Sequence, residues 1–274
     1  MPPVFVVWAQ AIPSPPVLMS SSFVFEGLSG LPLDDQLKIS RFGRGPSQGV
    51  SFFTVHEAFE NIVDALPSAI AARHGKRAIT YSELDACANG LARRLIGLGL
   101  RPKRRVCLVV QRSFEMLVGI LAVLKAGCQY VPIDGGVVSD MSLVHIFEDT
   151  EAEFVLCLPT FEDRVRKHTH KGTMVVPLDA KLETSWTLER PCIQTSYRDG
   201  AYAIYTSGSF KPPFFKISDV NISPGSTGKP KGVDVSHANV VNALTLEPGR
   251  LGISHGSKVA QVLNIAFDMG KKTF

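Results

Sequence analysis

Two short stretches of this chain carry residue types that could bind phosphate. Ala201–Thr206 is an apolar segment typical of a buried strand, and it runs into the small hydroxylated turn Ser207-Gly208-Ser209. Further on, segment 225–233 reads Gly-Ser-Thr-Gly-Lys-Pro-Lys-Gly-Val. Glycine lets backbone N–H groups approach an oxyanion, hydroxyls add donors, and lysine adds a positive charge. Together the stretches predict a phosphate-binding loop that follows a strand.

Other phosphate-binding patterns fit these residues less well. Gly228-Lys229 is followed by Pro230 instead of Ser or Thr, and Ser223 stands where a Walker-type loop has glycine. No Gly-x-Gly-x-x-Gly follows a strand, so a Rossmann dinucleotide site has no support. A Ser/Gly-rich surface turn is the plainer alternative. The long, directional order of strand, hydroxyl turn and Lys-Pro-Lys-Gly favours the phosphate loop over it.

Composition bounds the class of protein. The 274 residues are 45% hydrophobic and 20% charged, which is ordinary for a soluble globular protein. The net charge of +4 is modest and the basic residues are spread out, so no nucleic-acid partner is expected. The sequence has no run of 18 apolar residues, so no membrane span is expected. We expect a cytoplasmic protein. His168 and His170 have no partner ligands nearby in sequence, so no metal site is expected. The cysteines are interpreted as buried free thiols: Cys87, Cys107, Cys128, Cys157 and Cys192.

Apolar periodicity predicts alternating strands and helices from Thr54 onward, with a capping box between Thr54 and Glu57 and a second helix capped by Ser82. Asp134 is interpreted as a turn aspartate rather than a metal ligand. Residues 1–50 show no sustained period and are interpreted as a poorly ordered leader or linker. The expected strands are 69–72, 78–81, 106–110, 129–132, 154–158, 174–178, 201–206, 233–235 and 258–263, and later helices are expected at 113–125, 141–149, 161–167 and 236–246.

This alternation predicts an α/β fold with a mostly parallel sheet and helices on both faces. Ligands of such sheets bind at the carboxyl ends of the strands. The glycine-rich loop follows strand 201–206, so the sequence places the phosphate site at that edge.

With Phe210–Ser226 left out, the two stretches join as Tyr-Thr-Ser-Gly-Ser-Thr-Gly-Lys-Pro-Lys-Gly-Val, which resembles the phosphate-loop signature of adenylate-forming enzymes. That superfamily includes acyl-CoA synthetases, luciferases and the adenylation domains of nonribosomal peptide synthetases. Segments 79–84 and 124–134 resemble its first two core motifs. The resemblance implies that ATP, with Mg²⁺, is held on its pyrophosphate side by the following residues: Thr206, Ser207, Gly208, Ser209, Ser226, Thr227, Gly228, Lys229, Lys231 and Gly232.

Phe267-Asp268 is the second functional signal. From the residues alone, an aspartate after a buried strand is most simply a turn cap. In adenylation domains that activate amino acids, a Phe-Asp motif at this place supplies a carboxylate to the substrate's α-ammonium, and Asp268 matches it. Acyl-CoA synthetases and luciferases usually lack this aspartate, and segment 259–268 resembles fungal peptide synthetases in particular. The resemblance therefore implies an amino-acid substrate, with transfer to a phosphopantetheine arm on a carrier domain.

Two departures from the family pattern shape the expected domain organisation. Segment 210–226 interrupts the phosphate loop, either as a translated intron or as a genuine loop insertion. The chain then ends at 271–274 with an aberrant tail, before the small C-terminal subdomain that carries the family's catalytic lysine. Residues 51–270 are thus interpreted as an incomplete AMP-binding domain with no catalytic residue of its own. We expect this chain to be inactive in adenylation; the alternatives are a noncatalytic fragment with weak nucleotide binding and an acyl-CoA synthetase-type ligase.

Overall fold

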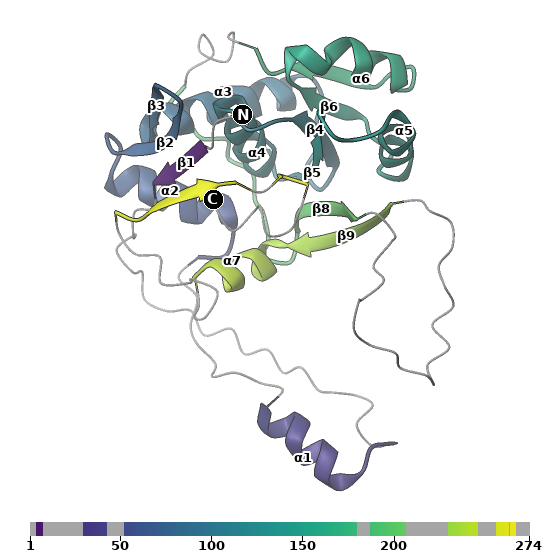
Figure 1. Ribbon diagram of the computed structural model, residues 1–274. Coiled ribbons are helices and arrows are strands. Elements are labelled where there is room, and N and C mark those ends of the chain that lie inside the picture. Colours follow the sequence, from purple (N-terminus) through teal and green to yellow (C-terminus); the bar gives the residue numbers. More distant parts are fainter. Residues whose placement is uncertain are drawn as a thin grey trace.

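Figure 1 shows the computed structural model, which describes residues 4–7, 30–42, 52–179, 187–206, 230–245, 256–262 and 264–266. A six-stranded sheet lies at its centre in the order β7-β6-β4-β5-β8-β9. Its strands are β4 (Arg105–Val110), β5 (Gln129–Asp134), β6 (Phe154–Cys157), β7 (Met174–Pro177), β8 (Gly200–Thr206) and β9 (Lys231–Ser236). Neighbouring strands from β7 to β8 are parallel, and only the pairing of β8 with β9 is antiparallel.

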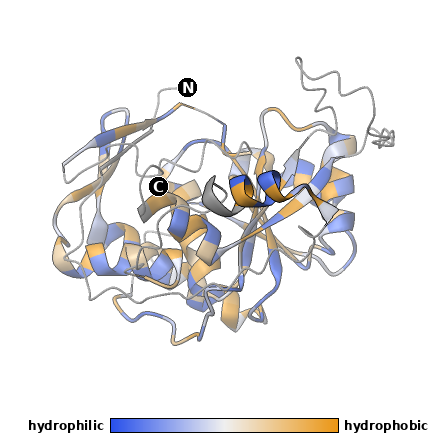
Figure 2. Ribbon diagram, turned by 90° about the horizontal axis from the view of Figure 1, so that it is seen from below, coloured by the Kyte–Doolittle hydropathy of each residue, from blue (hydrophilic) through white to orange (hydrophobic). Residues whose placement is uncertain are grey.

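Helices cover both faces of this sheet, because its central strands are apolar on both sides. The helices of the described residues are α1 (Leu33–Phe42), α2 (Val55–Ala65), α3 (Tyr81–Gly97), α4 (Phe114–Lys125), α5 (Asp140–Asp149), α6 (Glu162–His168) and α7 (His237–Thr245), with a 3₁₀ turn at Pro159–Phe161. Residues of α2, α3 and α4 form one core cluster with one set of strand side chains, and residues of α5 and α6 form a second with the other set. Figure 2 shows hydrophobic and hydrophilic residues mixed within the helices, as helices with one buried face require. The predicted α/β fold with a mostly parallel sheet is confirmed.

Local signals set most helix starts. The capping box predicted for Thr54 and Glu57 is present at the start of α2. Ser82, however, does not cap α3: the Thr80 side chain accepts a hydrogen bond from the Glu83 N–H, and the Glu83 carboxylate accepts one from the Thr80 N–H. The prediction for Ser82 is wrong because Thr80 has the glutamate that a reciprocal box needs three residues later.

A second, four-stranded sheet is antiparallel, in the order β10-β1-β2-β3. Its strands are β1 (Val4–Val7), β2 (Ile70–His74), β3 (Arg77–Thr80) and β10 (Lys258–Gln261). Two elements, β1 and α1, therefore lie in the part of the chain that the sequence predicts as a leader, and Figure 1 shows α1 apart from the two sheets. The division of the chain at residue 50 stays a prediction.

Cysteine burial and helix length give two further findings. Cys87, Cys107, Cys128 and Cys157 are buried free thiols as predicted, but Cys192 is exposed. Cys192 lies in the segment before β8 that forms neither helix nor strand. None of the helices in the described ranges has the length and apolar character that a membrane crossing requires.

Candidate functional site

The described ends of the predicted phosphate loop meet at the carboxyl edge of the six-stranded sheet. Thr206 is the last residue of β8, Lys231 is the first of β9, and the two are paired in the ladder. Lys231 and Gly232 are exposed at this edge. The structure thus brings Thr206, Lys231 and Gly232 together. The other predicted loop residues, which lie within 207–229, and Asp268 are outside the described residues.

Glycine at position 232 is explained by a close approach. Gly232 pairs with Tyr205 in the β8–β9 ladder, and a Cβ at position 232 would lie 2.9 Å from Cζ of the Tyr205 ring. Real Cβ atoms do not come this close to ring carbons, so a side chain here would displace the ring. The signature glycine that follows Lys231 therefore lets Tyr205 lie across β9.

Helix α5 contacts β8 and the residue that precedes β9. The Tyr205 hydroxyl donates a hydrogen bond to the Asp149 carboxylate, and Nε2 of His145 lies 2.9 Å from the Pro230 carbonyl oxygen. A carbonyl can only accept, so this histidine nitrogen carries the proton. Burial and the neighbouring Asp149 carboxylate raise the pKa of the Tyr205 phenol, which keeps it a donor. Sequence reasoning missed His145 and Asp149, since nothing local shows that a helix reaches strands beyond residue 200.

The turn after β5 lies at the same edge. Asp134 accepts a hydrogen bond from the Gly136 N–H at 2.8 Å, so its prediction as a turn aspartate is confirmed. Arg164 of α6 donates to the Gly135 carbonyl at 2.8 Å and to the Val138 carbonyl at 2.6 Å. These bonds fix the chain between β5 and α5, and so the point where α5 begins.

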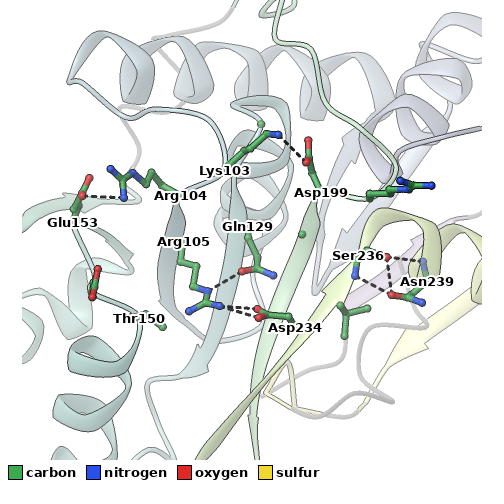
Figure 3. A pocket seen from close by; sticks show the side chains of 15 residues that line it. Lys103, Arg104, Arg105, Gln129, Thr150, Glu153, Asp199, Asp234, Ser236 and Asn239 are labelled. Carbon is green, nitrogen blue, oxygen red and sulfur yellow. Dashed lines mark hydrogen bonds and ion pairs between the residues drawn. The ribbon is translucent and has the colours of Figure 1, made fainter.

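A pocket of about 560 Å³ lies at the opposite, amino edge of the sheet. In Figure 3, Arg105 of β4, Gln129 of β5 and Asp234 of β9 point toward one another. Arg105 donates to both Asp234 oxygens, at 2.9 and 3.1 Å, and to Gln129 at 3.0 Å. Lys103 and Arg104 are likewise paired, with Asp199 and Glu153. With these cations already neutralised, and with ligands of parallel sheets favouring the carboxyl edge, we do not assign the nucleotide to this pocket.

Two histidines connect α7, which follows β9, to the start of α2. The Val55 N–H donates to Nδ1 of His237 at 3.2 Å, and the His56 and His237 rings meet edge to face with centroids 5.5 Å apart. Burial lowers the pKa of His237 to about 4 and that of His56 to about 3, with the neighbouring His237 adding to the latter. Both rings are therefore neutral at neutral pH. In the described part of the chain, no three His, Cys, Asp or Glu side chains gather in a group that could hold a metal ion.

Comparison with known protein families gives one match: the model of the AMP-binding enzyme family matches residues 59–209. Among curated proteins, an adenylate-forming reductase of Coprinopsis cinerea is 41% identical over 244 residues, which are 88% of this chain and 22% of the relative. Malpinin synthetase of Mortierella alpina is 35% identical over 243 residues, 88% of this chain and 3% of that protein. The chain thus spans 22% or less of the length of these relatives.

Solved structures agree in fold. The chain matches an AMPPNP-bound nonribosomal peptide synthetase with a TM-score of 0.68 at 23% identity, covering 86% of this chain and 23% of the other. It also matches the N-terminal subdomain of NpsA from Klebsiella oxytoca with a TM-score of 0.59 at 24% identity, covering 78% of this chain and 49% of the other. At these identities the likeness shows the fold alone.

Proposed function

Because this chain belongs to the AMP-binding enzyme family, we propose that it is the ATP-binding part of a protein that activates a carboxylate as an acyl-adenylate. The observation that carries this proposal is the position of the phosphate-loop signature. Its described ends, Thr206 and Lys231, lie side by side at the carboxyl edge of a mostly parallel sheet. Backbone N–H groups, hydroxyls and lysines that follow such a strand suit the phosphates of ATP.

The proposed reaction follows from the chemistry of ATP. A carboxylate oxygen forms a bond to the α-phosphorus, the bond from that phosphorus to the bridging oxygen breaks, and pyrophosphate leaves with the electron pair. We propose that the ammonium of Lys231, an exposed residue, offsets negative charge on the phosphates. Mg²⁺ would accompany the nucleotide, with phosphate oxygens and water as most of its ligands. We propose the remaining signature residues, Ser207 to Ser209 and Ser226 to Lys229, as the rest of the cradle.

The proposed substrate is an amino acid. Asp268 follows Phe267 as in amino-acid-activating domains, and a carboxylate there would pair with the substrate's α-ammonium. One relative of this chain is named a synthetase and another a reductase, so the names of the two imply different steps after activation. In a parent protein of the synthetase type, the acyl group would pass to a phosphopantetheine arm on a carrier domain.

Nucleotide binding is the first test. Titration of the purified chain with AMPPNP in the presence of Mg²⁺ should show binding that Lys231→Ala weakens about tenfold, the effect of losing one charge-assisted contact. Lys38→Ala is the matched control, because Lys38 is an exposed lysine of α1 and should leave the affinity unchanged. A chain that binds no AMPPNP, or that binds equally well with Lys231→Ala, would refute the proposed site.

Activation is the second test. Amino-acid-dependent ATP–pyrophosphate exchange should be measured on the parent protein, with pools of amino acids and of fatty or aryl acids compared. Asp268→Ala should abolish exchange with amino acids, whereas exchange that prefers the other acids, or that survives this substitution, would make the amino-acid assignment wrong.

We further propose that segment 210–226, which separates the two parts of the signature, is a translated intron, and that the chain keeps weak nucleotide binding despite it. Sequencing the transcript across this region decides the question. A message that joins Ser209 directly to Thr227 would support the proposal, and a message that encodes the segment would show a genuine loop insertion instead.

A further inference from the structure

We infer that α5 positions the phosphate loop, with His145 and Asp149 as its positioning residues. The two residues are four apart in one helix, so they lie one above the other on the same face. Asp149 holds Tyr205, the residue before Thr206, and His145 holds Pro230, the residue before Lys231. One rigid helix thus fixes both chain ends between which the loop runs. The inference rests on the proposed function for its consequence, but not for its geometry.

β9 needs such support because it is an edge strand among the described residues. β8 is its one neighbour in the sheet, and four successive residues at the start of β9 are exposed. The ladder with β8 sets the register of β9 but leaves the tilt of the pair to side-chain contacts. At the amino edge of the sheet one such contact is Arg105 with Asp234. At the carboxyl edge Tyr205 pairs with Asp149, and His145 bonds the Pro230 carbonyl.

The chemistry of each contact suits a fixed anchor. Proline has no N–H, so the carbonyl is the only backbone group through which residue 230 can be held by a hydrogen bond. The phenol of Tyr205 stays protonated because burial and Asp149 raise its pKa, so its bond to a carboxylate persists across the neutral range. A further bond fixes the start of α5: Arg164 of α6 donates to the Asp140 carboxylate, in the first turn of α5, at 2.7 Å.

The consequence is that the side chains of α5 affect phosphate affinity through the chain ends that they hold, Tyr205 and Pro230. Loss of the His145 donor should let the Lys231 end of β9 move, which lowers phosphate affinity without removing any phosphate ligand. A shift of about 1 Å in a phosphate-binding group is enough to matter.

The test compares three variants of the whole chain. His145→Leu removes the donor, His145→Gln keeps a side-chain N–H of similar reach, and Arg105→Met removes the clamp at the opposite edge. AMPPNP affinity should fall about tenfold in His145→Leu, the effect of one lost hydrogen bond, and recover in His145→Gln. Arg105→Met is expected to lower stability yet keep the wild-type affinity, because its contacts lie at the amino edge.

Amide hydrogen exchange without nucleotide gives a readout independent of binding. His145→Leu should speed exchange at the Lys231 end of β9, and Arg105→Met at the Ser236 end. Unchanged exchange in His145→Leu, unchanged affinity, or a loss that His145→Gln fails to rescue would each overturn the inference. If the wild-type chain binds no AMPPNP, the proposed function fails, and the exchange data alone decide whether α5 holds the strand ends.

Discussion

Substitution of Lys125 by methionine tests whether a buried ion network joins three helices of the core. Lys125 is the last residue of α4, and its side chain is 1% exposed. Its ammonium lies 2.8 Å from the carboxylate of Asp85 on α3, which is 5% exposed, and it also pairs with Glu60 on α2. Arg190, from the segment before β8, reaches the other Asp85 oxygen at 3.6 Å. Methionine is an unbranched side chain one atom shorter, so it removes the ammonium, with its charge and its N–H donors, and keeps most of the apolar stem.

The magnitude depends on the contacts that Asp85 retains. Removing one partner of a buried ion pair costs about 3 to 5 kcal/mol, because the other charge stays buried without compensation. Asp85 would keep the Asn89 amide at 3.0 Å and the more distant Arg190. These two contacts offset part of the loss, so we expect the lower end, about 3 kcal/mol. Lys38→Met is the matched control: Lys38 pairs with Asp34 on the surface of α1, and such pairs contribute about 0 to 1 kcal/mol.

Urea unfolding followed by far-UV circular dichroism measures the free energy of unfolding of each variant. The double variant Lys125→Met with Asp85→Asn should recover part of the loss, because a neutral amide has no buried charge to compensate. A loss below about 1 kcal/mol in Lys125→Met, or a double variant less stable than the single one, would refute the reasoning that the network is held by charge.

Three further outcomes are expected. His237 takes up a proton near its ordinary pKa of 6.5 in the unfolded chain, but only near 4 in the folded chain. The stability that its neutral form contributes is therefore fully present above pH 6.5 and is lost as the pH falls toward 4. His237 contributes about 2 kcal/mol to this loss by pH 5, and His56, whose pKa is also lowered, adds to it. His237→Gln should therefore make the slope shallower in urea titrations run at each pH, and an unchanged slope would contradict this. Gly127→Ala should lower the melting temperature more than Gly99→Ala. Both glycines have positive φ, but of these two positions only 127 would bring a Cβ against another side chain, 2.6 Å from Ile193. Equal shifts in melting temperature would contradict this. Cys192 alone should react rapidly with a thiol reagent in the native chain, since the other four cysteines are buried; fast reaction of a second thiol would contradict the described core.

Most of the secondary structure of the sheet region could be predicted from local sequence. β4, β5, β6 and β8 are apolar runs bounded by turn residues, and Thr54 and Ser113 lie at helix starts where their side chains cap free N–H groups. The strand β1 escaped prediction, because its partners β2 and β10 lie far along the chain and a four-residue apolar segment has no period of its own. The prediction for Ser82 is wrong for the opposite reason, since two hydroxyl residues compete locally and only the reciprocal bond with Glu83 decides between them.

For the candidate site, too, local sequence determines one part and the tertiary structure another. The chemistry of the phosphate loop can be read from local sequence: its glycines, hydroxyls and lysines lie close together along the chain, so their types and order carry the phosphate-binding signal without any fold. The contacts that hold the loop, by contrast, come from the tertiary structure. Tyr205 and Asp149, and likewise His145 and Pro230, are far apart in sequence and meet because the parallel sheet places β8 and β9 beside α5. Contacts of this kind depend on packing across the sheet, which no local pattern of residues encodes.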